Sequence, residues 1–377
     1  MNSRINLAHI TLSMGIGGIE KLIVSLIGLL GREKYSITVI CLDFGGELVS
    51  QLKKQGVEVL VIGRKDGLDW RLFFKLAHLF RERKFDIVHT HNQAALFYAG
   101  IAAKLARIPL LITTEHSRHN TEGKWRRQLE KRLLCRISNK WIVVSKELAE
   151  ESVVQDGLPI GKIKVIENGV DFKKYDLNQQ SKPLQQDKAK NELGLSEDCK
   201  IIIMVARLHP IKNHKLFLES FSEVLGQCPN THVLIVGDGE CRDALVGQAA
   251  ALQISAYVHF LGYREDVAEL LELSDVFVLC SKSEGLPVSL LEACAAHVSV
   301  LITKSSNKAG LIVDGSTGTV VEDNKASLRD GLLTILNNFD KAKALSNEAA
   351  LQVKAQYSLS AMCKKYQNIY SCCEKNK

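Results

Sequence analysis

Short aliphatic and β-branched runs alternate with stretches of helical periodicity along most of this 377-residue chain. In the first half we predict strands at 5–12, 36–42, 57–62, 87–90, 110–114, 141–145 and 163–166, with helices at 19–30, 48–55, 72–83 and 94–106. Strands that alternate with helices in this way form βαβ units around a parallel sheet. The pattern therefore predicts an α/β fold.

The alternation stops at residues 172–198, a polar stretch rich in Lys, Gln and Asn, and then starts again. Further strands are predicted at 200–205, 231–236, 258–260, 276–279 and 298–303, a helix at 216–225, and a mainly helical end over the last 50 residues. A chain of this length suits two domains. We therefore predict two doubly wound parallel-sheet domains, residues 1–178 and 179–358, that bind ligands at the carboxyl ends of their strands.

Composition excludes several other classes of protein. Apolar residues make up 46% of the chain and charged residues 24%, which is too apolar for a disordered protein. The apolar run at residues 22–30 is much shorter than the roughly 20 residues that span a bilayer, and we expect no secretory signal. The ten cysteines show no Cys-x-x-Cys and no zinc-site spacing, so we expect buried free thiols in a reducing cytoplasm.

A glycine cluster, Gly15-Ile16-Gly17-Gly18, lies between the first predicted strand and the first predicted helix. Glycines at this place let the backbone approach a ligand, and the helix N-terminus offers free N–H groups to an anion. Position 20 is Glu, so the cluster is not the dinucleotide fingerprint, and no P-loop lysine follows. A tight turn without a ligand explains the glycines equally well.

Two cations, Arg207 and Lys212, follow the first strand of the second half. Two positive charges at the carboxyl end of a strand can hold a diphosphate. Pro210 between them indicates a turn, which allows both side chains to reach one ligand. The alternative is a solvated basic loop.

Two glutamates, Glu284 and Glu292, flank a Gly285-Leu286-Pro287 turn. Pro287 suits the first turn of a helix, so we expect Glu284 in a loop and Glu292 on the helix that follows. Both could then face one ligand. The alternative is surface charge, which the apolar strand before and the apolar helix after make less attractive.

Together these three features resemble the retaining glycosyltransferases of family 4, and the resemblance covers nearly the whole chain. It implies a GT-B fold, in which two Rossmann-like domains face each other across a cleft and a C-terminal helix, here about 359–377, packs back on the first domain. The Glu-x7-Glu spacing is its most specific element. It implies that Arg207 and Lys212 hold the donor diphosphate, Glu284 the donor sugar and Glu292 the ribose, with a donor-binding set of Gly17, Gly18, Arg207, Lys212, Gly262, Tyr263, Arg264, Gly285, Leu286, Pro287 and Glu292.

The resemblance also implies roles in the first half. His116 is expected beside the reacting sugar and, with Glu284, forms the catalytic set, whereas His91 and Asn92 are expected on the acceptor side. A satisfied structural role for His91 is equally compatible with the sequence. We expect His89 and His91 to face opposite sides of their strand, so that they do not line one pocket together.

The chain departs from the family pattern at two places. His297 and Ser299 stand where the family usually has Gly and Pro, and residues 306–310 replace Gly-Gly-x-Pro-Glu. Three hypotheses therefore remain: a sugar transferase, a nucleotide-sugar epimerase on the same fold, and a catalytically impaired nucleotide-sugar-binding scaffold. The Glu-x7-Glu pair argues against the epimerase.

Charge and motifs bear on partners and cofactors. No Asp-x-Asp occurs, so we expect no metal and no other cofactor, and no nucleic-acid reader motif is present. We expect a UDP- or GDP-type nucleotide sugar as donor and a glycan or lipid-linked acceptor, in the synthesis of envelope polysaccharide such as lipopolysaccharide, capsule or exopolysaccharide. The donor sugar, its base and the linkage stay open.

Residues 1–175 carry 28 basic against 18 acidic residues, and 118–140 alone carry eight against two. This segment predicts a helix with an apolar stripe of Trp125, Leu129, Leu133 and Ile137 and a basic face of Lys124, Arg126, Arg127, Lys131 and Arg132. Such a helix either lies on an anionic membrane or packs on the core with a solvated basic face. We expect a cytoplasmic enzyme, or one peripheral on the inner face of the cell membrane.

Overall fold

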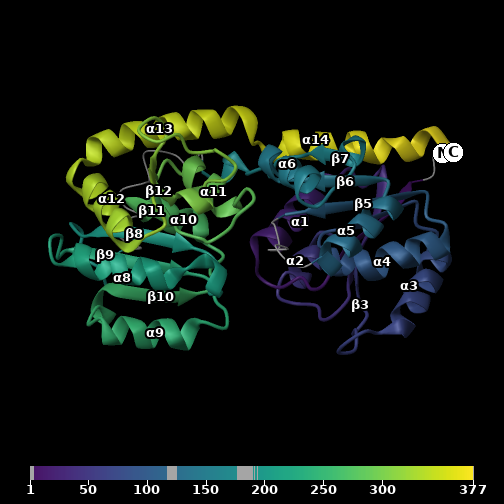
Figure 1. Ribbon diagram of the computed structural model, residues 1–377, viewed down its shortest axis with the longest axis horizontal. Coiled ribbons are helices and arrows are strands. Elements are labelled where there is room, and N and C mark those ends of the chain that lie inside the picture. Colours follow the sequence, from purple (N-terminus) through teal and green to yellow (C-terminus); the bar gives the residue numbers. More distant parts are fainter. Residues whose placement is uncertain (1–3, 117–124, 176–189, 191, 193, 377) are drawn as a thin grey trace. The chain divides into compact units, whose positions relative to one another are not determined.

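The computed structural model describes residues 4–116, 125–175, 190, 192 and 194–376 (Figure 1). They form two compact units, one of Met1–Gly169 with Leu359–Lys377 and one of Val170–Ser358. The boundary that we expect at 178/179 falls within residues 176–189, outside the described part. Both units are α/β with a parallel sheet, which confirms the predicted fold class.

The first unit is built on a seven-stranded parallel sheet in the order β3-β2-β1-β4-β5-β6-β7. The chain starts in the middle of the sheet and winds outward in both directions, as in a doubly wound fold. The strands are β1 (Ile5–Thr11), β2 (Tyr35–Cys41), β3 (Glu58–Val61), β4 (Ile87–Thr90), β5 (Leu110–Glu115), β6 (Lys140–Val143) and β7 (Ile163–Val165). All seven lie within a few residues of the predicted ranges.

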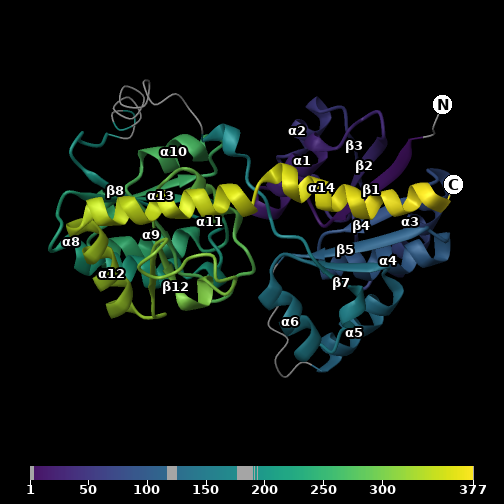
Figure 2. The same ribbon diagram turned by 90° about the horizontal axis from the view of Figure 1, so that it is seen from above.

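The helices of this unit are α1 (Gly18–Leu29), α2 (Val49–Lys54), α3 (Trp70–Glu82), α4 (Gln93–Ala106), α5 (Trp125–Ile137), α6 (Lys146–Val154) and α14 (Leu359–Tyr370), with 3-10 turns η1 (Ile160–Lys162) and η6 (Ser371–Asn376). Helix α6 is not among the sequence predictions. Figure 2 shows α14, in yellow, lying over the sheet of the first unit.

Helix α14 belongs to the hydrophobic core of the first unit although it ends the chain. Leu359, Met362, Tyr366 and Tyr370 recur every three or four residues and are buried in one cluster with side chains of β1, β2 and α1. Burying a large apolar side chain contributes about 1.5–3 kcal/mol, so this helix is a substantial part of the unit's stability.

The second unit contains a six-stranded parallel sheet in the order β10-β9-β8-β11-β12-β13. Its strands are β8 (Lys200–Val205), β9 (Thr231–Val236), β10 (Val258–Gly262), β11 (Val276–Leu279), β12 (Ser299–Thr303) and β13 (Thr319–Val321). Every residue of β11 and β12 is buried, as expected for strands covered on both faces. The sequence predictions include all of these strands except β13.

The helices of this unit are α8 (His214–Leu225), α9 (Arg242–Ala251), α10 (Val267–Leu273), α11 (Val288–Ala295), α12 (Lys325–Asn337) and α13 (Phe339–Gln356), with 3-10 turns η2 (Phe172–Lys174), η3 (Pro210–Lys212), η4 (Ser255–Tyr257) and η5 (Lys304–Ser306). The sheet is the frame, and the loops at the carboxyl ends of its strands carry the polar side chains described next.

Candidate donor-binding site and histidine cluster

Four loops at the carboxyl edge of the second sheet are linked by backbone hydrogen bonds. The backbone N–H of Leu208, after β8, donates to Asp238 O after β9 at 3.0 Å, and that of Gly237 donates to Gly262 O at the end of β10 at 2.8 Å. The N–H of Lys282, after β11, donates to Ile211 O at 2.8 Å. Most of the predicted donor-binding residues therefore lie on one connected set of loops.

A close backbone approach requires glycine in this set. Gly237 has φ +134°, and a Cβ there would lie 2.1 Å from Ala206 O. Any side chain would push the loop after β9 away from the loop after β8. The glycine thus holds the backbone next to Arg207 in a fixed position.

Lys212 and Glu284 form a direct ion pair. Lys212 Nζ lies 2.5 Å from Glu284 Oε1, and the Glu284 side chain is only 8% exposed. A carboxylate removed from water needs a partner of opposite charge, and Lys212 supplies it. The cation predicted for the diphosphate and the carboxylate predicted for the sugar are therefore direct neighbours.

Arg207 is in a different environment from Lys212. Its side chain is 64% exposed and Nη2 lies 3.2 Å from Glu240 Oε2, with His209 Nε2 at 3.4 Å from the other oxygen of Glu240. Of the two cations, Arg207 is therefore mostly in solvent, whereas the Lys212 side chain is only 25% exposed.

Glu292 lies on α11 and is half-buried. Burial, followed by the charge and a hydrogen bond of Glu292, raises the pKa of the Tyr175 hydroxyl far above its usual range. Tyr175 is 93% buried, so it remains a neutral donor to this carboxylate at any physiological pH. Nothing in the sequence pointed to Tyr175. Pro287 is the N-cap of α11, one residue before the helical turn that we predicted for it.

The turn after β10 carries Gly262, Tyr263 and Arg264. Gly262 has φ +65°, which favours glycine, and Arg264 Nε donates to Asp266 Oδ1 at 2.7 Å. The hydrogen bond from Arg264 outweighs burial and lowers the pKa of Asp266. The guanidinium is thereby held in one orientation beside the turn.

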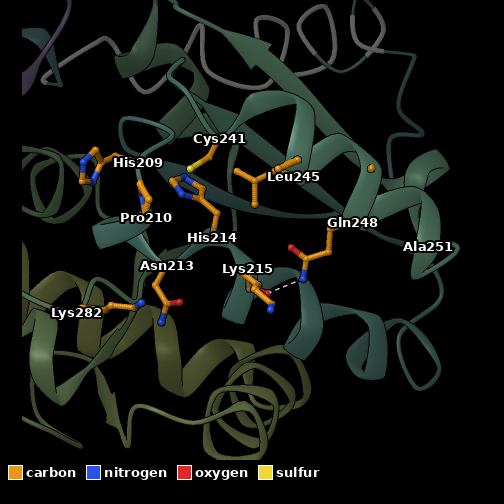
Figure 3. A pocket seen from close by; sticks show the side chains of 12 residues that line it. His209, Pro210, Asn213, His214, Lys215, Cys241, Leu245, Gln248, Ala251 and Lys282 are labelled. Atoms are coloured by element: carbon orange, nitrogen blue, oxygen red, sulfur yellow. Dashed lines mark hydrogen bonds between the residues drawn. The ribbon is translucent and has the colours of Figure 1, made fainter.

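A pocket of about 600 Å³ lies next to the Lys212 loop (Figure 3). It is lined from η3, α8, α9 and the loop after β11, including His209, Asn213, His214 and Lys282. Burial lowers the pKa of His214 to about 4, so this ring lines the pocket as a neutral imidazole. Arg207, Glu284 and Glu292 are not among the lining residues. The sequence analysis did not find this pocket.

In the first unit, the glycine turn lies between β1 and α1, as predicted. Gly17 is the N-cap of α1 with φ −150°, an extended conformation open to any residue. A Cβ at Gly17 would lie 2.2 Å from Glu20 Oε2, whereas Gly46, at φ +100°, approaches the backbone of Met14 and Gly15. The turn is therefore supported from the Gly46 loop, a contact that the sequence does not indicate.

Four histidines form one buried cluster in this unit: His9, His89, His91 and His116. The rings of His89 and His91 lie 4.2 Å apart between centroids, so the expectation that they face opposite sides is wrong. Residues two apart on a strand share a face. The register places His9 beside His89, and the sequence analysis missed His9.

Burial dominates the electrostatics of this cluster. It lowers the pKa of His9 to about 3 and that of His116 to about 4. For His89 and His91, burial and then neighbouring histidines hold the pKa well below the usual range. All four rings are therefore neutral at physiological pH. Asn92, predicted on the acceptor side, caps α4 by accepting a hydrogen bond from Ala95 N at 2.7 Å.

Comparison with known proteins decides the family. A sequence model of glycosyltransferase family 4 matches residues 16–174, and one of group 1 glycosyl transferases matches residues 185–352. The chain is a family 4 (group 1) glycosyltransferase.

Relatives match this glycosyltransferase over most of their length. The UDP-Gal:alpha-D-GlcNAc-diphosphoundecaprenol alpha-1,3-galactosyltransferase of Escherichia coli is 28% identical over 346 residues, which is 86% of this chain and 85% of that protein. A glycosyltransferase from Rickettsia africae superposes with a TM-score of 0.83 at 20% identity, over 99% and 100% of the two chains. Anabaena HepE in complex with UDP-glucose gives 0.84 at 20% identity, over 98% and 100%. The expected GT-B fold and retaining transferase class are thus confirmed.

The glycosyltransferase accommodates its two departures from the family pattern in structured backbone. His297 has φ +58°, the left-handed region where glycine is favoured, and Nδ1 lies 2.9 Å from Asn347 Oδ1. In the 306–310 segment, Ser306 Oγ donates to Ser281 O at 3.0 Å, and the Asn307 side chain makes two hydrogen bonds with the backbone of Ile312. The altered segment is therefore anchored next to the loop that carries Glu284.

Helix α5 of the glycosyltransferase differs from its prediction. Trp125, Leu129 and Leu133 are 65%, 48% and 50% exposed, so three of the four residues of the predicted apolar stripe face outward, and Ile137 is half-buried. Lys131 is buried between Glu115 and Asp156, at 2.7 and 2.5 Å, and is not part of a basic face. Lys124 lies outside the described residues. No helix in the described part of the chain is long and apolar enough to cross a membrane.

Proposed function

We propose that this glycosyltransferase moves a sugar from a UDP- or GDP-type donor to a lipid-linked glycan acceptor in envelope polysaccharide synthesis. The name of the Escherichia coli relative supports both the UDP-type donor and the diphospholipid acceptor. The Lys212–Glu284 ion pair carries the argument for the donor site. It places a cation and a carboxylate side by side at the carboxyl edge of the second sheet. This pair matches a nucleotide sugar, in which a diphosphate lies next to the hydroxyl groups of a sugar.

In this proposal the cations and the carboxylates contact different parts of the donor. Arg207 and Lys212 neutralise the diphosphate as it leaves, and the N-terminus of α11 adds free N–H groups. Glu284 accepts hydrogen bonds from the donor sugar once Lys212 turns to the phosphates. Glu292, held by Tyr175, accepts from the ribose. Gly262, Tyr263 and Arg264 are proposed to contact the base. From the family resemblance, His116 contacts the reacting sugar and His91 lies on the acceptor side.

Incubation of the purified protein with UDP- and GDP-sugars tests the proposal. We expect slow release of the nucleoside diphosphate with one donor, and a large increase when a polyprenyl diphosphate sugar is added. Interconversion of the sugars would indicate the epimerase instead. Saturable binding without any release would indicate the impaired scaffold that the 306–310 segment suggests.

We further propose that α5 docks the enzyme on an anionic membrane surface. The exposed faces of α5 combine the apolar side chains of Trp125, Leu129 and Leu133 with the guanidinium groups of Arg126, Arg127 and Arg136. Arg132 is directed elsewhere, because its Nε donates to Asp156 O at 2.6 Å. Exposed apolar residues beside cations are typical of helices that lie in the headgroup region. A lipid-linked acceptor would be presented at such a surface.

A further inference from the structure

Three of the buried histidines form a chain of ring-to-ring hydrogen bonds. His9 Nδ1 lies 2.8 Å from His91 Nε2, and His91 Nδ1 lies 3.4 Å from His116 Nε2. The planes of successive rings are 19° and 24° from parallel, with centroids 5.1 and 5.7 Å apart. At these separations the rings meet edge to edge rather than face to face, so an N–H of one ring can point at the lone pair of the next.

Two ring nitrogens, one at each end of this series of three histidines, take no part in its hydrogen bonds. Within the described residues, His9 Nε2 and His116 Nδ1 are buried and have no hydrogen-bond partner. A neutral imidazole carries one proton, so it donates from one nitrogen and accepts at the other. The chain therefore has two consistent states: all three protons on Nδ1, or all three on Nε2. The tautomer of His116 is thus coupled to that of His9, two rings away.

Burial at the His9 end favours one of the two states. Each state leaves one N–H at an end of the chain without a partner in the described residues, on His9 Nε2 in one state and on His116 Nδ1 in the other. His9 is 0% exposed and His116 is 9% exposed, so an unpaired N–H costs less at the His116 end. A proton on His9 Nδ1 is donated to His91, so the unpaired N–H is not at the His9 end. His91 then donates from Nδ1 to His116 Nε2, and His116 carries its own proton on Nδ1.

His89 supports the chain without joining it. Its Nδ1 lies 2.7 Å from the Tyr370 hydroxyl and its Nε2 lies 2.8 Å from Thr114 Oγ1, so both nitrogens are occupied. The His89 ring packs against His91. His9, His89 and His91 have ligand atoms within 4.8 Å of one another, as a metal site would need. A metal there would have to break hydrogen bonds to Tyr370, Thr114 or within the chain.

We propose that His9 and His91 are positioning residues that lock His116 as an Nδ1–H donor, which makes one hydrogen bond to an oxygen of the reacting sugar. The contact with the sugar rests on the proposed function. The tautomer itself does not, because every atom that fixes it lies in the first unit.

Long-range ¹H–¹⁵N spectra of the protein labelled with ¹⁵N-histidine at neutral pH report which ring nitrogen is protonated. We expect His9, His91 and His116 all to carry the proton on Nδ1. A protonated Nε2 on any of the three would overturn the proposal, whether or not a donor sugar has been found. Addition of zinc is expected to leave the signals of His9, His89 and His91 in place, and stoichiometric zinc binding that shifts them would also overturn it.

Variants separate positioning from packing. His91→Phe removes both hydrogen bonds of the central ring, so an Nε2–H form of His116 should appear and kcat should fall about tenfold at unchanged KM for the donor. His9→Asn is the second test, for use if His91→Phe proves too unstable to study. It keeps an amide donor near His91 Nε2, so His116 should stay protonated on Nδ1.

Tyr370→Phe is the matched control. It removes a buried hydrogen bond from the same cluster but leaves the hydrogen bonds between His9, His91 and His116 intact. The His116 tautomer and kcat should therefore stay unchanged while thermal stability falls. If Tyr370→Phe lowers kcat as much as His91→Phe does, the cluster acts by packing alone and the proposal fails. Absence of sugar transfer by the wild-type protein would remove the proposed function, and the spectra would still decide the tautomer.

Discussion

The ammonium of Lys212 lies 2.5 Å from the carboxylate of Glu284, whereas Arg207, five residues before Lys212, is mostly in solvent. This difference separates two cations that the sequence presents as equivalent. We expect Lys212→Ala to destabilise the second unit by about 1–3 kcal/mol, because it leaves a buried carboxylate without its partner. Arg207→Ala should change the free energy of unfolding by less than about 0.5 kcal/mol. Chemical denaturation of the two variants measures the contrast, and equal stabilities would contradict it.

In activity, the two variants should look alike. Each removes one preorganised charge from the leaving diphosphate, a loss of roughly 3–4 kcal/mol of transition-state stabilisation, or about 10²–10³ in rate. Release of nucleoside diphosphate from the preferred donor is the measurement. Wild-type turnover in either variant would remove that residue from the proposed clamp.

The glutamates should separate turnover from binding. Glu284→Gln is expected to lower kcat strongly and to leave the affinity for the free nucleoside diphosphate nearly unchanged, because its proposed partner is the sugar. Glu292→Gln should weaken nucleotide binding instead, and Tyr175→Phe should do so to a smaller extent through the carboxylate that it orients. Calorimetry with the free nucleotide compares the three variants. The opposite pattern for the two glutamates would mean that their proposed roles are reversed.

Acid should destabilise the first unit. The pKa of His9 falls from 6.5 to about 3 on folding and that of His116 to about 4, so the unfolded chain binds more protons below pH 6.5. The contribution of these neutral histidines to the free energy of unfolding is complete above pH 6.5 and is lost as the pH falls toward the folded-state pKa values. By pH 5 the loss is at most about 2 kcal/mol per histidine. Thermal unfolding between pH 7 and 5 measures the slope. His9→Asn should make the slope shallower, and an unchanged slope would show that His9 does not contribute.

Membrane docking should depend on both sets of exposed α5 side chains. Each cation close to an anionic leaflet contributes about 1 kcal/mol, and the attraction fades at high salt as the Debye length shrinks to about 3 Å at 1 M. We expect sedimentation with anionic liposomes at low salt and release by salt. Arg126→Glu with Arg127→Glu and Arg136→Glu should abolish it, as should Trp125→Ser with Leu129→Ser.

The Glu223→Gln change, on α8 in the other unit, is a control for altered charge and should sediment like the wild type. Nucleotide binding should be unaffected by the α5 changes. Sedimentation of the charge-reversed variant at the wild-type level would leave α5 as a solvated face. Lys131 is kept in every variant because Glu115 and Asp156 need its charge.

The sequence by itself determined the two parallel sheets and the place of the donor-site candidates in them. Local patterns suffice for this, because a buried strand such as β11 reads as a continuous apolar run, and the loop with Glu284 follows directly. The histidine cluster was also within reach: strand alternation puts His89 and His91 on one face, and we assigned the alternation wrongly.

Only the tertiary structure decided which polar groups became partners. Lys212 meets Glu284 and His9 meets His91 across gaps of 72 and 82 residues, and Tyr370 reaches His89 from the far end of the chain. The basic helix shows the same limit. The spacing of Trp125 and Leu129 predicts an apolar stripe, but burial of that stripe depends on which other elements pack against the helix. Lys131 is buried instead, because the carboxylates of Glu115 and Asp156 lie beside it and neutralise its charge.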